Sequence, residues 1–261
     1  MAKLLFLGDI CGRGGRQWVS HRIPTLRREL ELDFVVANGE NAAGGFGITA
    51  DIVQELLSNG VDGITLGNHV WDQRGFDQAI DGLPKVCRPA NLPEGCPGRD
   101  FLILERNGLK IGVFSVIGRV MMNMSLDCPF KKADKLVSKK QGLNGIFVDI
   151  HAEATSEKQA MGWFLDGRVT AVIGTHTHVV TADEKIMPKG TAFQTDAGLC
   201  GSHRSIIGCE PDPIIHRFLT GIPCRLTVAS GDIRINATLI TFDPTTGLAT
   251  DIQRLEDKQP E

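Results

Sequence analysis

Short apolar runs alternate with amphipathic stretches along most of the chain. Runs of about four to eight residues rich in β-branched side chains, separated by helical stretches, are typical of buried parallel strands. The sequence therefore predicts strands at 3–8, 34–37, 63–66, 145–149, 169–173 and 191–195. Helices are expected at 16–31, 50–59, 74–81 and 154–165, with another helix after a loop within 118–144.

Turn-forming residues set several of the expected boundaries. Thr49 is expected to cap the helix at 50–59 and Gly60 to end it. Pro24 is expected to bend or break the first helix.

Other segments have a more β-like pattern. They are a short strand at 86–91, a hairpin of 101–106 and 110–117 around Asn107-Gly108, and an antiparallel hairpin at 224–242 around Ser230-Gly231. No internal repeat or low-complexity linker interrupts the chain, so we expect one α/β domain with mixed sheets over residues 1–261.

Composition narrows the class of protein. The 261 residues are 42% hydrophobic and 23% charged, which is ordinary for a globular protein. A net charge of −3 gives no electrostatic reason to expect tight binding to duplex nucleic acid. No apolar run reaches the roughly 18 residues that span a bilayer, and the start, MAKLLFLGDI, reads as the first strand. Seven scattered cysteines without a CxxC pair indicate reduced thiols and a cytoplasmic location.

Polar clusters follow five of the predicted strands. They are Gly8-Asp9, Asn38-Gly39-Glu40-Asn41, Gly67-Asn68-His69, Asp149-Ile150-His151 and Gly174-Thr-His-Thr-His178. Ligands of open α/β sheets gather at the carboxyl ends of the strands, so these clusters are expected to share one edge.

The histidines are candidate ligands of a transition metal. His176 and His178 are two residues apart, and in an extended backbone both side chains would point the same way. The alternative is that both are ordinary polar loop residues. His151 follows a strand ending in Asp149 and would, taken alone, equally suit a structural role.

The oxygen donors also admit two interpretations each. Asp9 is a first-strand carboxylate or part of an Asx-turn. Glu40 lies between two asparagines, and a buried carboxylate is costly unless it is paired or binds metal, so it suits a bridge between two ions. Asn38 suits a turn. Asn68 suits either a turn or the role of a neutral metal ligand.

Together the donors suffice for two metal ions about 3.5–4 Å apart. The candidate ligands are Asp9, Glu40, Asn41, Asn68, His151, His176 and His178. No thiolate is required, which favours Fe, Mn or Zn over a soft-metal site. Cys11 lies two residues after Asp9 and could approach the metals, but we favour a role in packing or in supporting a ligand. His69 is a candidate general acid, with Asp72 to orient it.

Substrate contacts are less defined by the sequence. The glycine-rich loop 42–49 follows Glu40, and its Phe46 suits either stacking on a base or the core, of which we favour the core. Arg13 and Arg119 are candidate phosphate contacts.

These motifs, in this order, resemble the calcineurin-like metallophosphoesterase superfamily. Three positions depart from its pattern: Cys11 replaces the first histidine, Glu40 replaces the bridging aspartate, and Gly-Thr-His-Thr-His replaces Gly-His-x-His. The departures resemble the narrower family of YmdB-like phosphodiesterases. The matching stretches are ANGENAAGGFGIT (37–49), TLGNHVWD (65–72), LDCPF (126–130), HAEATSEK (151–158), GTHTHVVTADE (174–184) and MPKGTAFQTDAG (187–198).

The resemblance implies a four-layer αββα sandwich, that is, two mixed β-sheets flanked by helices. It implies that Glu40 bridges two metals, that Asn41 takes the place of the missing histidine, and that His69 donates a proton. Fe or Mn are the favoured metals, with Zn or Mg as alternatives.

The same resemblance implies a substrate and an assembly. It points to hydrolysis of 2′,3′-cyclic nucleoside monophosphates to 3′-monophosphates by a metal-bridging hydroxide, in a homo-oligomer (dimer or tetramer). Two alternatives stay open: a broader phosphodiesterase or nuclease acting on 3′,5′-cyclic nucleotides or RNA ends, and a regulatory protein that senses nucleotides.

Overall fold

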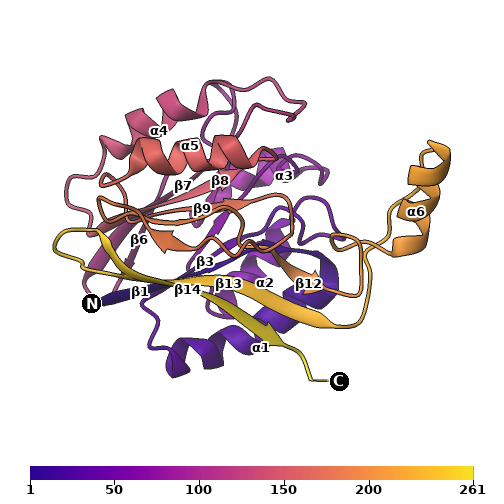
Figure 1. Cartoon of the computed structure of the whole chain (residues 1–261), viewed down its shortest axis with the longest axis horizontal. Coiled ribbons are helices and arrows are strands. Elements are labelled where there is room, and N and C mark those ends of the chain that lie inside the picture. The colour runs from indigo at the N-terminus through magenta and orange to yellow at the C-terminus, as the bar shows by residue number, and fades with distance from the viewer. Residues whose placement is uncertain (261) are drawn as a thin grey trace.

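Two mixed β-sheets lie face to face between outer layers of helices (Figure 1). The structure is a computed structural model that describes residues 1–260. The first sheet has strand order β2-β12-β13-β1-β3-β4-β5, with β14 paired to β13. Its strands are β1 (Ala2–Leu7), β2 (Asp9–Ile10), β3 (Phe34–Asn38), β4 (Gly63–Thr65), β5 (Val86–Cys87), β12 (Leu199–Ser202), β13 (Ile233–Phe242) and β14 (Ala249–Lys258).

The second sheet has strand order β10-β11-β9-β8-β7-β6. Its strands are β6 (Leu102–Arg106), β7 (Leu109–Ile117), β8 (Gly145–His151), β9 (Ala171–Thr175), β10 (Lys185–Ile186) and β11 (Ala192–Gln194). The helices are α1 (Gly12–Glu29), α2 (Ala50–Ser58), α3 (Phe76–Ala79), the 3₁₀ turn η1 (Ile80–Gly82), α4 (Pro129–Val137), α5 (Thr155–Leu165) and α6 (Pro211–Thr220).

Three apolar layers hold the sandwich together. Phe6 of β1 packs on Phe147 of β8 between the two sheets, with ring centroids 4.7 Å apart. Helices α1 and α2 cover the outer face of the first sheet, and α4 and α5 cover the outer face of the second. The αββα architecture predicted from the sequence is thus confirmed.

Parallel pairing brings the polar strand ends together. Strands β1, β3, β4 and β5 run parallel in the first sheet, as do β7, β8, β9 and β11 in the second. The predicted parallel strands are all present, because their buried apolar runs are the strongest signal in the sequence. Thr49 caps α2 as expected, accepting a hydrogen bond from the backbone N–H of Ile52.

The first helix does not break at Pro24. Helix α1 begins at Gly12 and continues through Pro24 to Glu29. Pro24 is exposed, so its ring lies on the outer side of the helix and does not disturb the packing of α1 on the sheet.

The expected hairpin at 224–242 was wrong. Strand β13 begins only at Ile233 and pairs with β14, through a turn at 243–248. Residues 203–232 instead form an arm that projects from the sheets and carries α6 (Figure 1). The expected strand at 86–91 is also shorter, covering only Val86–Cys87. Among residues 1–260, no helix combines the length and apolar character needed to cross a bilayer.

Candidate metal centre

The seven candidate ligands all lie where strands end, on one rim of the sandwich. Asp9 lies in β2, Glu40 and Asn41 follow β3, and Asn68 follows β4. His151 is the last residue of β8, and His176 and His178 follow β9. The rim therefore draws on both sheets, which explains how residues far apart in the chain can meet.

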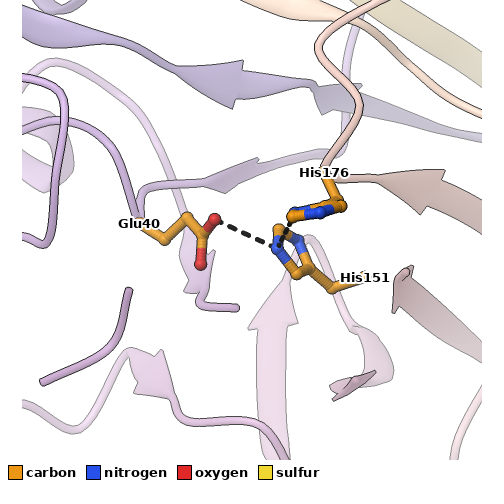
Figure 2. Close-up of side chains that lie close together, drawn as sticks. All are labelled: Glu40, His151 and His176. Atoms are coloured by element: carbon orange, nitrogen blue, oxygen red, sulfur yellow. Dashed lines mark hydrogen bonds and ion pairs between the residues drawn. The ribbon is translucent and has the colours of Figure 1, made fainter. Parts of the chain in front are cut away.

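Four donor atoms converge at one point, and Nε2 of His151 is the atom that the other three surround. This Nε2 lies 3.0 Å from Glu40 Oε1 and 3.1 Å from His176 Nδ1 (Figure 2). The same Nε2 lies 2.8 Å from Asn68 Oδ1. Metal bonds of about 2.1 Å place neighbouring ligand atoms roughly 3 Å apart, so these separations suit ligands of one ion. Glu40, His151 and His176 form a group that could hold a metal ion.

A second group adjoins the first through Glu40. Asn41 Nδ2 lies 3.4 Å from Glu40 Oε1 and 3.1 Å from His178 Nε2. Asp9 Oδ1 lies 3.9 Å from His178 Nε2 and is buried without a hydrogen-bond partner among residues 1–260. Leaving a buried carboxylate oxygen unpaired is costly, and a cation bound there would compensate for it. The donor set thus fits a metal at this position as well.

Polar contacts on the outer side of each imidazole direct its other ring nitrogen toward the centre. His178 Nδ1 donates to the Ile207 carbonyl at 2.8 Å, because a carbonyl can only accept. His176 Nε2 lies 3.2 Å from Glu153 Oε2, so its Nδ1 faces the centre. His151 Nδ1 lies 2.8 Å from Thr175 Oγ1, so its Nε2 faces the centre. Such outward partners are what fix the tautomer and orientation of metal-binding histidines.

The buried charges at this rim call for a cation. Burial raises the pKa of Asp9 to about 6, against the influence of His178 and His151. Burial also opposes ionisation of Glu40, but His151 and His69 outweigh it and lower the pKa to about 2. Burial disfavours the charge on His151, yet Glu40 and Asp9 raise its pKa to about 9. The positive charge of protonated His151 thus compensates the buried carboxylates, and a bound metal cation could supply that positive charge instead.

His176 behaves differently from His151. Burial and the nearby charge of His151 lower the pKa of His176 to about 3. A neutral imidazole is the form that binds metal, so His176 needs no deprotonation to serve as a ligand.

Gly67 lets the two sheets approach at the centre. A Cβ atom at this position would lie 2.3 Å from Glu40 Oε2 and 2.4 Å from His151 Nε2. No side chain fits there, so the glycine is a packing requirement of the donor cluster.

The loop with two histidines is not extended, contrary to the reasoning from its spacing. His176 and His178 both have positive φ angles, 97° and 63°. Thr177 between them donates to Asp196 Oδ2 through its backbone N–H (3.1 Å) and its hydroxyl (2.7 Å). This anchor, and not the alternation of side chains along an extended strand, brings both imidazoles to the rim.

Asp196 is itself held by a buried charge. Lys158 Nζ lies 2.7 Å from Asp196 Oδ2, and both side chains are fully buried. Four residues that support the centre were not predicted from the sequence: Lys158, Asp196, Thr175 and Glu153. A signal existed for Lys158, since it shares the buried stripe of α5 with Met161 and Leu165 at helical spacing.

His69 lies beside the cluster with a different set of contacts. Its backbone N–H donates to Glu40 Oε2 at 3.0 Å, and its Nδ1 lies 2.7 Å from Asp72 Oδ2, the partner expected from the sequence. The carboxylate accepts the Nδ1 proton, which leaves Nε2 for exchange with a substrate.

A pocket of about 390 Å³ opens over this centre, with Glu40, Asn41, His69, His176 and His178 among its lining residues. Phe46, expected in the core, is half-buried and lines the pocket. Cys11 also lines it, and burial raises the pKa of its thiol to about 12, so it is a neutral packing residue. Arg13 and Arg119 are exposed and neither lines the pocket, so the structure does not bring either suggested phosphate contact to the centre.

The sandwich of two mixed sheets, with a group at its rim that could hold a metal ion, is the architecture of the calcineurin-like metallophosphoesterases. A family model described as "YmdB-like protein" matches residues 5–255. The chain belongs to this family.

Relatives and solved structures agree with that assignment. The chain is 44% identical over 254 residues to the 2′,3′-cyclic-nucleotide 2′-phosphodiesterase of Bacillus subtilis (strain 168), covering 97% of this chain and 96% of the relative. A hypothetical protein from Thermus thermophilus superimposes with a TM-score of 0.93 at 40% identity, covering 99% of this chain and 100% of that one. A phosphatase from Mycoplasma pneumoniae gives 0.92 at 33% identity, with 98% and 93% covered.

Proposed function

We propose that this chain hydrolyses 2′,3′-cyclic nucleoside monophosphates to 3′-monophosphates at a centre that holds two metal ions. The observation that carries the proposal is the convergence of three imidazoles, with the inward nitrogen of His151 beside Glu40, that of His178 facing Asp9, and that of His176 beside His151. The name of the Bacillus subtilis relative supports the choice of substrate.

The proposed ligands fall into two groups that share Glu40. One group comprises Asn68, His151 and His176, and the other comprises Asp9, Asn41 and His178. Glu40 Oε1 lies within 3.4 Å of both groups, which supports its role as the bridge. Asn41 presents Nδ2 to His178, so it would have to turn its amide and offer Oδ1 to a metal.

When bound, two metal ions would supply Lewis acidity toward the phosphoryl oxygens and lower the pKa of a coordinated water. The nitrogen and oxygen donors, without a thiolate, support iron or manganese, with zinc or magnesium as alternatives.

His69 is proposed to donate the proton to the leaving oxygen. Asp72 accepts from its Nδ1, and the hydrogen bond from its backbone N–H to Glu40 fixes the main chain beside the centre. In the reaction, a water molecule loses one proton and its oxygen bonds to phosphorus, the P–O2′ bond breaks, and O2′ takes the proton carried by His69 Nε2. The proton released by the water then replaces the one that His69 gave up, so the step balances. The product is the 3′-monophosphate.

The test is product analysis with manganese- or iron-loaded protein. We expect 2′,3′-cAMP to give 3′-AMP, identified by chromatography, with no product from the chelated protein. Asn68→Ala should abolish turnover, whereas His21→Ala, an exposed site on α1, should not change it. Formation of 2′-AMP, or a preference for 3′,5′-cAMP or RNA ends, would contradict the proposal.

The general-acid role needs its own comparison. His69→Ala should lower kcat by roughly 10²–10⁴-fold on 2′,3′-cAMP. The loss should be much smaller on a p-nitrophenyl ester, whose leaving group needs no proton. Equal losses on both substrates would reject the role of His69 as proton donor.

We also propose a cytoplasmic location and a homo-oligomer, dimer or tetramer. All seven cysteines are free, which supports a reducing compartment. On α6, Phe218 and Leu219 are each 81% exposed, which supports a contact between copies. Light scattering after size exclusion tests the assembly, and a monomer at micromolar concentration would reject it.

A further inference from the structure

One wall of the pocket over the centre is apolar. It combines Phe46, from the loop after β3, with Ile207, Ile214 and Leu226 of the arm at 203–232. The two segments are far apart in the sequence, and both line this pocket. Because the same pocket is lined by His69 and Glu40, a bound molecule would touch the wall and the centre together.

Ile207 is held in a backbone conformation that β-branched residues avoid. Its φ is 45°, and it forms with Gly208 (φ 97°) a two-residue turn closed by reciprocal backbone hydrogen bonds between Ile206 and Cys209, at 2.9 and 3.0 Å. Ile207 is 53% exposed, so packing in the hydrophobic core does not explain why an isoleucine occupies this strained position. Its carbonyl accepts from His178 Nδ1, so the turn is fixed against the centre while the side chain stands in the pocket.

Phe46 is fixed on the opposite segment. Its carbonyl accepts from Gln73 Nε2 at 2.6 Å, and its ring meets the His69 ring edge-on, with centroids 5.0 Å apart and an angle of 71° between the planes. The aromatic ring therefore adjoins the proposed proton donor.

The charges in the pocket indicate what kind of group the wall receives. Among the described residues that line it, none is lysine or arginine, and Glu153 adds a negative charge. A second phosphate would therefore find no cation away from the centre. A flat, uncharged ring would gain from stacking on Phe46 and from covering aliphatic side chains.

We propose that this wall is the nucleobase subsite, with the base stacked on the ring of Phe46 and covering the aliphatic side chains of Ile207, Ile214 and Leu226. The inference rests on the proposed cyclic-nucleotide activity and specifies how the nucleoside is recognised. Stacking accepts any base, because every base has a π-face, so purine and pyrimidine substrates are turned over with similar kcat/KM.

The test compares a nucleotide with a substrate that lacks the base. Wild-type protein, Phe46→Ala and Ile207→Asn are assayed on 2′,3′-cAMP and on methyl riboside 2′,3′-cyclic phosphate. Asparagine tolerates a positive φ and keeps the carbonyl that His178 requires. Phe164→Ala, a partly exposed ring on α5 remote from the pocket lining, is the control for general effects on folding.

We expect the wild type to prefer the nucleotide at least tenfold in kcat/KM. Phe46→Ala and Ile207→Asn should reduce that ratio, mainly through KM for the nucleotide, and Phe164→Ala should leave it unchanged. A wild type without preference for the nucleotide, or variants that lose equally on both substrates, would overturn the subsite and leave the proposed function standing.

A binding measurement distinguishes an error in the proposed base subsite from an error in the proposed activity. If metal-loaded wild type turned over neither substrate, the proposed activity would be wrong. Calorimetry with 3′-AMP and ribose 3-phosphate would then still decide on the subsite. Tighter binding of 3′-AMP by wild type, lost in Phe46→Ala, supports it, and equal binding of the two ligands refutes it.

Discussion

Oγ1 of Thr175 lies 2.8 Å from Nδ1 of His151, at the point where two neighbouring parallel strands end. The same hydroxyl donates to Asp149 Oδ1 at 2.6 Å, so it must accept from the imidazole. The other carboxylate oxygen of Asp149, Oδ2, accepts hydrogen bonds from Thr65 Oγ1 (2.6 Å) and Asn38 Nδ2 (3.0 Å). A buried carboxylate thus links both sheets and sets the tautomer of the central histidine.

Replacing Thr175 by valine should weaken metal binding without removing any ligand. The substitution keeps the shape but deletes the acceptor of His151 Nδ1, so the ring is free to turn or change tautomer. Loss of such an outer partner typically costs about 10- to 100-fold in metal affinity. Competition with a chromogenic chelator measures it. Thr175→Ser, which keeps the hydroxyl, should bind as wild type does, and equal affinity of the valine variant would refute the orienting role.

The parts of the fold that the sequence predicts are those with buried, repetitive patterns. Strands such as β3 and β8 are buried along their whole length, so their apolar runs indicate them without tertiary information. The polar residues that follow them then fall at one edge because parallel strands share a direction. The candidate ligands came together for this reason.

The wrong predictions concern segments that are exposed or whose conformation depends on contacts distant in the sequence. Strand β14, ATDIQRLEDK, lies at an edge with most side chains exposed, so its composition resembles a loop. The turn signal at Ser230-Gly231 was therefore assigned to a hairpin that belongs at 243–248. The positive φ angles of His176 and His178 depend on Asp196, about 20 residues away, and no local pattern contains that contact.

A methyl group at Gly67 should disrupt the centre. Gly67→Ala places Cβ within 2.4 Å of His151 Nε2 and closer still to Glu40 Oε2, so one of the two donors must move away. We expect metal stoichiometry to fall, as measured by plasma emission spectrometry on dialysed protein, with an unchanged circular dichroism spectrum. Gly82→Ala, with nothing within 4 Å of its Cβ, is the matched control. Full metal content in Gly67→Ala would show that the donor cluster is not the binding site.

Removing metal should destabilise the protein measurably. A ligand at 100 times its Kd stabilises the folded state by about 2.7 kcal/mol, which for a chain of this size corresponds to roughly 5–10 °C in melting temperature. Chelation should lower the melting temperature by about that amount, and added manganese should restore it. Asp9→Asn should respond less to both treatments, because it removes the charge of a buried carboxylate whose Oδ1 has no hydrogen-bond partner among residues 1–260. A chelator-independent melting curve for the wild type would contradict a metal at this rim.

Breaking the buried pair of Lys158 and Asp196 should act on stability and on the centre together. Lys158→Met leaves the Asp196 carboxylate buried without its cation, which typically costs about 3–5 kcal/mol. Urea unfolding measures the loss. Lys110→Met is the control, because its pair with Glu105 at 2.8 Å is exposed and contributes about 0–1 kcal/mol.

Asp196 also anchors Thr177, so the loss should reach the two neighbouring histidines. We expect Lys158→Met to bind metal more weakly even in the absence of urea, where it is still folded. Adding Asp196→Asn removes the unpaired charge, so the double variant should be more stable than Lys158→Met alone. It should nevertheless not regain metal affinity, because one amide oxygen cannot replace the carboxylate contacts of Thr177 and Gly198 together. Recovery of stability and metal affinity together would mean that the pair supports the fold without positioning the loop.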